Sequence, residues 1–261
     1  MENFYLAQKM IKNNGGKSKR FMEVIKMKIT NLKVYDLYES IVASGYAMRT
    51  DDVTSETIEN EVSLVRQYID WYGKCSVARS AKEPKSVRDG YTKWKQLVCN
   101  HVRRAINLGN CKVGSGHGNY LNGIRVSFDL TMTNKAWVEW ERYHFQDIVC
   151  SQSTMHRITK FDLKSQFNEY VWDDTIEKLD KKCNEYNQLE DKSSENAKEL
   201  YLEILYNVPS GIELTARVTT DYSQLKTMYY QRKDHRLPEW REFCEYIKEE
   251  LPLFKEFCLG E

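Results

Sequence analysis

Alternating apolar and polar residues mark three stretches of the chain as β-strands. They cover residues 27–37, 124–130 and 213–220, and each alternates with the period of two that places one side of a strand in a core. Long segments with other patterns separate them, so these strands have to pair across large distances in the sequence. The pattern predicts a small sheet of two or three short strands.

Apolar residues that recur every three or four positions predict helices over most of the remaining chain. The predicted helices cover residues 36–49, 54–73, 86–108, 134–144, 166–188, a segment ending near 206, 222–232 and the segment from 238 on. Asp36 is expected to cap the first helix, and Gly73 is expected to end the second. The sum predicts an α+β fold, a helix-rich chain around a small mixed or antiparallel sheet.

The chain divides into an extension and one domain. Residues 1–28 carry seven Lys or Arg and two acidic residues, and an Asn/Gly-rich break follows the first short helical stretch. We therefore predict a basic N-terminal extension at 1–26 and a single α+β domain at 27–261. Residues 50–110, approximately, form a long helical segment of that domain.

Composition and charge limit the class of protein. The 261 residues are 41% hydrophobic and 30% charged, which is typical of a packed globular chain, and no apolar run approaches the roughly 20 residues that span a bilayer. The N-terminus lacks the apolar block of a secretory signal, so we expect a cytoplasmic protein without a membrane partner. A net charge of +1 argues against a nucleic-acid polymer as partner.

The richest chemistry lies in residues 143–158, YHFQDIVCSQSTMHRI. Cys150 with His144 or His156 suggests a thiol nucleophile or a metal site, but spacings of six residues favour neither. Seven scattered cysteines without a C-x-x-C pair are typical of reduced thiols, and we expect no metal. An anion site is the more attractive alternative, although hydroxyl-rich segments also cap helices. Its candidate residues are Arg142, Ser151, Ser153, Thr154 and Arg157.

Two other segments carry comparable groups. The cluster GSGHGNYLNG places His117 among glycines, which allow a close approach of the backbone to a ligand. The segment 232–236 bunches arginine, lysine and histidine before the last helix. Each alone is typical of a turn, but together with residues 142–157 they predict that three separated segments converge on a polyanion.

The order of these features resembles the flavin-dependent thymidylate synthases, whose hallmark is R-H-R followed by seven residues and a serine. The resemblance extends from about His117 to Phe257. Glu139-Trp140-Glu141-Arg142 stands where the family has Gln-x-x-Arg, so Arg142 resembles the first hallmark arginine, and Tyr143-His144 replaces His-Arg.

The later parts of the motif can also be located in this sequence. With a one-residue insertion Ser153 takes the place of the hallmark serine, and Arg157 is the nearest candidate for the arginine that follows it. Arg232 resembles the family's late arginine near the nucleotide, because its spacing from Pro209 is the same. The helical segment at about 50–110 then resembles an insertion.

The resemblance implies an enzyme that uses FAD to transfer a one-carbon unit from methylenetetrahydrofolate to deoxyuridine monophosphate or a related pyrimidine nucleotide, with NADPH as reductant. It also implies a homotetramer with shared active sites. The implied substrate-binding residues are Glu139, Arg142, Ser153, Arg157 and Arg232, of which Arg232 is also catalytic. The implied cofactor-binding residues are His117, Asn119, Arg142, His144 and His235.

An alternative function follows from the departures. The R-H-R motif is altered, and Leu205 stands where the family has an arginine. These changes favour a catalytically silent homologue that keeps the fold and binds a nucleotide or a protein partner.

Overall fold

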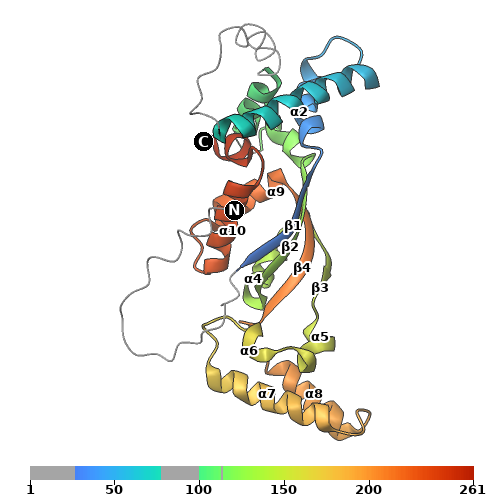
Figure 1. Cartoon of the computed structure of the whole chain (residues 1–261), viewed down its shortest axis with the longest axis vertical. Helices are drawn as coiled ribbons and strands as arrows, with labels where there is room; N and C mark the ends of the chain where they lie inside the picture. The colour runs from blue at the N-terminus through green and yellow to red at the C-terminus, as the bar shows by residue number, and fades with distance from the viewer. Residues whose placement is uncertain (1–26, 78–99, 113) are drawn as a thin grey trace, which may run out of the picture.

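A twisted four-stranded sheet runs through the middle of the molecule (Figure 1). The computed structural model describes residues 27–77, 100–112 and 114–261, so the predicted N-terminal extension and most of the predicted helix at 86–108 lie outside the described residues. The strands are β1 (Lys28–Tyr35), β2 (Arg125–Thr133), β3 (Gln146–Ser151) and β4 (Glu213–Asp221). Their order is β1-β2-β4-β3, and every pair is antiparallel.

The two central strands explain why the sheet has one apolar and one polar face. On β2 the buried apolar side chains are those of Val126, Phe128, Leu130 and Met132, and they alternate with polar ones. On the polar face Asp129 accepts a hydrogen bond from Arg217 at 3.1 Å, in register across β2 and β4. The apolar face alone therefore packs against helices, as the period of two requires.

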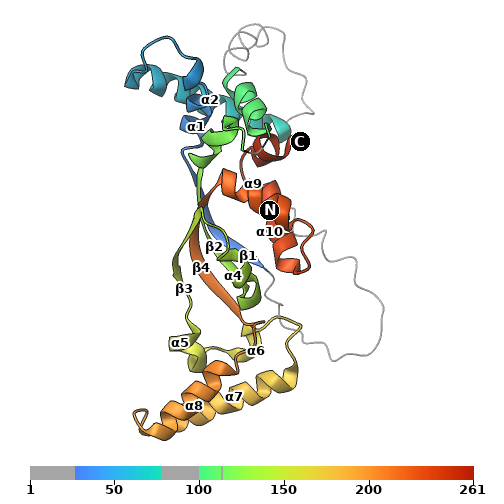
Figure 2. The same ribbon diagram turned by 180° about the vertical axis from the view of Figure 1, so that it is seen from behind.

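Helices cover one side of the sheet and extend the molecule at both ends (Figures 1 and 2). The helices are α1 (Leu37–Ala43), η1 (Tyr46–Met48), α2 (Ser55–Val77), residues 100–109, η2 (His117–Asn122), α4 (Asn134–Trp140), α5 (Thr154–Arg157), η3 (Ile158–Lys160), α6 (Leu163–Gln166), α7 (Asp173–Gln188), α8 (Glu195–Tyr206), α9 (Tyr222–Arg232), α10 (Pro238–Glu250) and the π-helical η4 (Lys255–Leu259). Both α9 and α10 lie beside the sheet, α1 and α2 lie at one end, and α5 to α8 lie at the other. None of the described helices combines the length and hydropathy needed to cross a membrane.

An aromatic cluster joins the sheet to α4 and α10. The rings of Trp140 and Trp240 stack with centroids 5.8 Å apart, and Phe243 meets both of them edge to face. Phe128 brings β2 into the same cluster, at 6.2 Å from Trp140. Such rings bury large apolar areas in defined geometries, so they fix α4 and α10 against the sheet.

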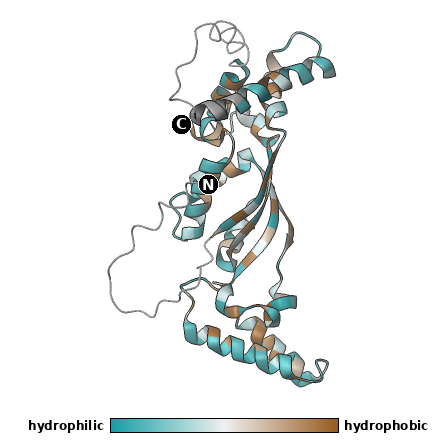
Figure 3. Cartoon of the chain, viewed as in Figure 1, coloured by the Kyte–Doolittle hydropathy of each residue, from teal (hydrophilic) through white to brown (hydrophobic). Residues whose placement is uncertain are grey.

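A second, smaller core lies at the far end of the molecule. It is formed by buried apolar residues of η3, α6, α7 and α8, among them Ile158, Leu163, Ile176 and Ile204. The helix α7 is coloured mainly hydrophilic, whereas α8 shows both hydrophilic and hydrophobic residues (Figure 3). The amphipathic pattern of each helix is thus satisfied by its neighbour, as expected of a helical hairpin.

The predicted α+β class is confirmed, and several boundaries differ from the predictions. The three predicted strands are β1, β2 and β4, and α9 spans the predicted residues. A fourth strand, β3, was not predicted, because as an edge strand it buries neither side and lacks alternation. The helix predicted at 134–144 is too long, since α4 ends at Trp140.

Three helix-boundary predictions were wrong. Gly73 does not end α2, which continues to Val77. Asp36 is left-handed at φ 56° and makes no side-chain cap to α1. The helix predicted at 166–188 begins only at Asp173, as α7, because residues 167–172 are not helical. Such boundaries depend on packing as much as on local preference.

A pair of buried carboxyl groups lies where β4, α4 and α10 meet. Glu213 and Glu239 are 5% and 8% exposed, and Glu239 accepts a hydrogen bond from Thr133 at 2.6 Å. One oxygen of Glu213 is buried without a hydrogen-bond partner. Burial, together with the charges of Glu239 and Glu242, raises the pKa of Glu213 to about 7.

This carboxyl group makes stability depend on pH. Its ordinary pKa is 4.5, so the folded chain holds the proton more tightly than the unfolded chain does, and the free energy of unfolding falls between about pH 4.5 and 7. We expect the substitution Glu213→Gln to remove this fall and to stabilise the protein at pH 8 by on the order of 1 kcal/mol, after allowance for solvent screening. Urea unfolding at pH 5, 6, 7 and 8 measures the difference.

The matched control is Glu245→Gln, which changes an exposed carboxyl group on α10. This variant is expected to keep the pH dependence of the unmodified protein. Equal pH dependence in the Glu213→Gln variant and the unmodified protein contradicts the prediction.

Candidate functional site

Arg232 is the centre of a polar site on the side of the sheet that carries the helices. Its Nε donates to the Tyr143 hydroxyl at 2.8 Å, and a terminal nitrogen lies 2.9 Å from a Glu139 carboxylate oxygen. Its guanidinium also lies 5.1 Å from the ring centre of Trp240. With only 12% of its side chain exposed, Arg232 is held in one orientation by contacts on several sides.

The Glu139 carboxylate connects Arg232 to a second arginine. Arg142 donates to the same oxygen of Glu139 at 3.1 Å, and 70% of its side chain is exposed. Burial opposes the charge of Glu139, but the hydrogen bonds and charges of Arg232 and Arg142 outweigh it and lower its pKa. Two guanidinium groups thus share one carboxylate, which leaves positive charge for an incoming anion.

Tyr143 completes this arrangement. Its hydroxyl accepts from Arg232 and donates to the Gln231 side-chain oxygen at 3.0 Å. Burial is the main reason that the pKa of Tyr143 is raised, so the phenol stays protonated at neutral pH. The tyrosine therefore orients Arg232 and carries no charge of its own.

These groups line a pocket of about 290 Å³, which we call the arginine pocket. The lining residues are Arg142, Tyr143, His144, Phe145, Gln224, Thr227, Gln231 and Arg232. The Phe145 N–H donates to the Gln224 side chain at 3.2 Å, which ties the segment after α4 to α9. Two guanidinium groups, amides and an exposed aromatic ring suit an anion that carries a planar polar ring.

Two short helices position the pocket. Thr133 caps α4 by accepting from the Ala136 N–H at 3.2 Å, and Asp221 caps α9 by accepting from the Gln224 N–H at 2.8 Å. Arg232 is the last residue of α9, where the helix dipole favours positive charge. The caps and the aromatic cluster therefore fix α4 and α9, the two helices whose ends lead to Arg142 and Arg232.

The predicted site residues divide along β3. Arg142, His144 and Arg232 line the arginine pocket, and Glu139 binds both arginines. Ser153 and Arg157 lie at the opposite end of β3, at and within α5 (Figure 1). The six residues of β3 separate the two groups by roughly 20 Å.

The remaining predicted residues lie elsewhere. His117 and Asn119 are exposed on η2, beside the start of α9, where the Tyr222 N–H donates to Ile124. Arg232 ends the same 11-residue helix, about 15 Å away. Only two of the three segments predicted to converge on a polyanion therefore do so within one chain.

The structure also gives the positions of His235 and Cys150. His235 lies in the turn after α9, where its Nδ1 accepts from the Leu237 N–H at 3.2 Å, and burial and the charge of Arg232 lower its pKa. Cys150 is an exposed free thiol on β3 in register with Arg217, away from the arginine pocket. Among the described residues no group of three or more metal-ligating side chains was found.

Four lining residues, Phe145, Gln224, Thr227 and Gln231, were not predicted from the sequence. A signal was available, because 224, 227 and 231 recur at the three- and four-residue spacing of one helix face that leads to Arg232. The role of Tyr143 was not predicted either, because its partners are 88 and 89 residues away in sequence.

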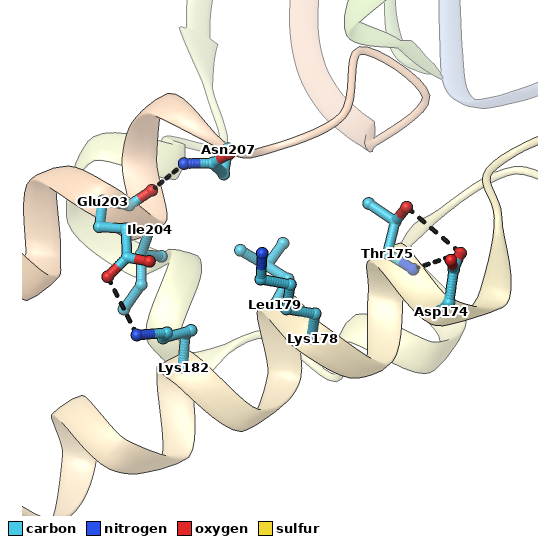
Figure 4. A pocket seen from close by; sticks show the side chains of 8 residues that line it. All are labelled: Asp174, Thr175, Lys178, Leu179, Lys182, Glu203, Ile204 and Asn207. Atoms are coloured by element: carbon cyan, nitrogen blue, oxygen red, sulfur yellow. Dashed lines mark hydrogen bonds and ion pairs between the residues drawn. The ribbon is translucent and has the colours of Figure 1, made fainter.

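Another pocket lies between α7 and α8 (Figure 4). Its lining carries two cations, Lys178 and Lys182, and two anions, Asp174 and Glu203, and Lys182 lies 3.1 Å from Glu203. Leu179 and Ile204 form part of its apolar lining. With its charges balanced, this pocket offers less to an anion than the arginine pocket does.

No protein-family model and no curated protein matches this chain. Among solved structures, it is similar to a flavin-dependent thymidylate synthase ThyX from Helicobacter pylori complexed with FAD and dUMP, at 12% identity and a TM-score of 0.47, over 61% of this chain and 82% of that one. It is also similar to thymidylate synthase X from Helicobacter pylori with FAD and dUMP. The identity is 13% and the TM-score 0.48, over 68% of this chain and 92% of that one. The site of this chain therefore has to be judged on its own geometry.

The Tyr143 hydroxyl provides a direct test of the site geometry. The substitution Tyr143→Phe removes one bond to Gln231 and one to Arg232, so we expect the free energy of unfolding to fall by about 1–2 kcal/mol in urea titrations. The control is Tyr206→Phe, because the Tyr206 side chain is 86% exposed. Equal stability of both variants contradicts the described hydrogen bonds.

Proposed function

We propose that this chain is a flavin-dependent thymidylate synthase-like enzyme whose arginine pocket binds the phosphate of a pyrimidine nucleotide. The observation that carries the proposal is the joint placement of Arg142, His144 and Arg232 in one pocket. The sequence resemblance singled out these three residues, although Arg232 is 90 positions from Arg142. Convergence of residues so distant in sequence supports a shared role in binding.

The substrate in this proposal is deoxyuridine monophosphate or a related pyrimidine nucleotide. The fixed guanidinium of Arg232 and the exposed one of Arg142 are donors for its phosphate or its ring carbonyls. Glu139 holds both arginines before the nucleotide arrives and has to share them afterwards. A carboxylate in this place thus weakens nucleotide binding, in keeping with a divergent site.

FAD does not fit the site of a single chain. A pocket of about 290 Å³ is at the lower end of the volumes that hold one drug-sized ligand, and a flavin dinucleotide is larger. The predicted cofactor residues His117 and Asn119 lie at the other end of α9. FAD binding therefore needs surfaces of more than one chain, and the chemistry that FAD would supply is hydride transfer, with methylenetetrahydrofolate as carbon donor and NADPH as reductant.

A surface suited to a second copy runs along β3. This strand lies at the edge of the sheet, and exposed apolar side chains lie on it, before it and after it: Phe145, Ile148, Val149 and Met155. They are 71%, 37%, 62% and 60% exposed, an unusual concentration for so short a stretch of surface. We call these four residues the β3 strip.

Pairing of two copies through the β3 strip would bring residues of both chains into each site. A two-fold axis through the middle of β3 exchanges its ends, so Ser153 and Arg157 of a second copy come beside Arg142 and Arg232 of the first. Two composite sites form at once, each with residues from both chains. A homotetramer made from two such pairs is the proposed assembly.

A second candidate function is a silent homologue that binds a nucleotide but no flavin. It is favoured by Tyr143, which takes the place of the hallmark histidine and is engaged by Arg232 and Gln231. The two functions differ in flavin binding, and this difference is measurable.

The visible absorbance of the purified full chain with added FAD distinguishes the two functions. After removal of free FAD, the enzyme is expected to retain flavin absorbance and to form deoxythymidine monophosphate when deoxyuridine monophosphate, methylenetetrahydrofolate and NADPH are supplied. A colourless protein without turnover that still binds the nucleotide supports the silent homologue.

The affinity of an Arg232→Ala variant for deoxyuridine monophosphate tests whether this arginine binds the nucleotide. Loss of a buried charged donor is expected to raise the Kd for deoxyuridine monophosphate by about tenfold or more. The control Arg103→Ala removes an exposed arginine far from the pocket and should leave the Kd unchanged. Unchanged binding in Arg232→Ala removes this residue from the site.

Mixing two defective variants tests the composite site. Arg142→Ala and Ser153→Ala chains are each expected to be defective in nucleotide binding, but co-folded equal mixtures should regain about a quarter of the intact sites. This fraction follows because half of the pairs are mixed and one of their two sites is intact. Nucleotide-binding stoichiometry is the readout, and no recovery contradicts the shared site.

A separate pair of variants tests whether two copies of the chain associate through the β3 strip. Val149→Asp places a charge in the β3 strip and should reduce the mass measured by light scattering. Leu202→Asp makes the same change at a 51% exposed residue of α8 and should not. Equal masses for both variants contradict the role of the strip.

A further inference from the structure

A larger pocket lies at the other end of α4 from the arginine pocket. It has a volume of about 450 Å³ and is bounded by the start of α4, the loop at 168–171, the segment at 210–211 and the start of α10. Its size is within the range that holds a small metabolite. We call it the α10 pocket, because residues 236–241 supply the largest part of its wall.

Three cationic residues line this pocket, Lys135, Arg236 and Arg241. Arg241 is held in place, because it donates to the backbone oxygens of His235 at 2.6 Å and Arg236 at 3.0 Å. Within the described part of the chain Lys135 and Arg236 form no ion pair, and both are exposed. Their charges are therefore available to a ligand.

The only carboxylate among the lining residues is Glu239. It is buried and already accepts a hydrogen bond from Thr133 at 2.6 Å. Among the side chains that line the pocket, three cations therefore face one anion. A ligand with two negative charges is the matching partner, and phosphate has the geometry that arginine binds best.

The rest of the wall suits an organic group and is already formed. Val171, Leu237 and the 69% exposed Tyr170 contribute apolar surface. A Cβ on Gly211 would lie 2.4 Å from Val171 and 2.9 Å from Asn168, so these segments pack as closely as glycine permits. The loop at 168–171 is thus fixed against 210–211 before a ligand binds.

The α10 pocket is distinct from the arginine pocket. The two lie at opposite ends of the seven-residue helix α4, with Thr133 and Lys135 at one end and Glu139 at the other. The length of α4 separates them by about 10 Å. No residue lines both pockets, so each can be altered without the other.

We propose that the α10 pocket is a second ligand site, for a small phosphate-bearing metabolite. The phosphate binds Lys135 and Arg236 beside the fixed Arg241, and the organic part lies against Tyr170 and Leu237. This site does not depend on the proposed enzymatic function.

Calorimetric titration of the full chain with inorganic pyrophosphate tests the proposal. We expect saturable binding that weakens about tenfold or more in Lys135→Ala and in Arg236→Ala, since each removes a charged donor from an exposed position where folding is not at risk. No saturable binding up to about 10 mM overturns the proposal.

Two controls locate the bound anion. Arg103→Ala removes an exposed cation that lines neither pocket, and Lys233→Ala removes an exposed cation from the same turn as Arg236. Both should bind pyrophosphate with an unchanged Kd. Equal weakening in all four variants, or weakening in the two controls alone, overturns the site.

Phenyl phosphate tests the organic part of the ligand. Tyr170→Ala should weaken phenyl phosphate by about threefold and leave pyrophosphate unchanged, because the ring contact is worth under about 1 kcal/mol at an exposed position. Equal affinities of Tyr170→Ala and the unmodified chain for phenyl phosphate overturn the assignment of this wall.

Discussion

The contact between Arg232 and the aromatic cluster is the constraint on which the arginine pocket depends. The guanidinium lies against Trp240, which stacks on Trp140, so the site shares its supports with the hydrophobic core. Trp140 also ends α4, which carries Glu139. Because a packed core holds its side chains in single orientations, the charges of Arg232 and Glu139 meet in a fixed geometry. A change in the cluster therefore alters the site as well as stability.

The same short helix places polar chemistry at both of its ends. At its start Thr133 caps α4 and donates to Glu239, and after its last turn Arg142 reaches back to Glu139. Both carboxylates are thereby committed to partners in the protein. The arginines and lysine around them keep an excess of positive charge in the two pockets. An α4 of seven residues is just long enough to keep these pockets apart.

The edge strand β3 divides the predicted site between two places. Arg142 and His144 precede it, and Ser153 and Arg157 follow it, so an extended backbone holds them apart. In sequence these residues look like one cluster, because sixteen positions seem a short span when the conformation is unknown. A strand rises more than twice as far per residue as a helix, and this difference turns one apparent site into two half-sites.

The sequence by itself determined the α+β class, three of the four strands and the limits of α9, because alternation and helical periodicity are local signals of burial. The resemblance to the flavin-dependent thymidylate synthases also singled out Arg142 and Arg232. Tertiary structure alone decided that these two arginines share Glu139, that Tyr143 orients one of them, and that Lys135, Arg236 and Arg241 line one pocket. It also decided the existence of β3, whose exposed residues carry no periodic signal. The physical reason is that contacts across the aromatic cluster join residues about 90 positions apart, which no local pattern records.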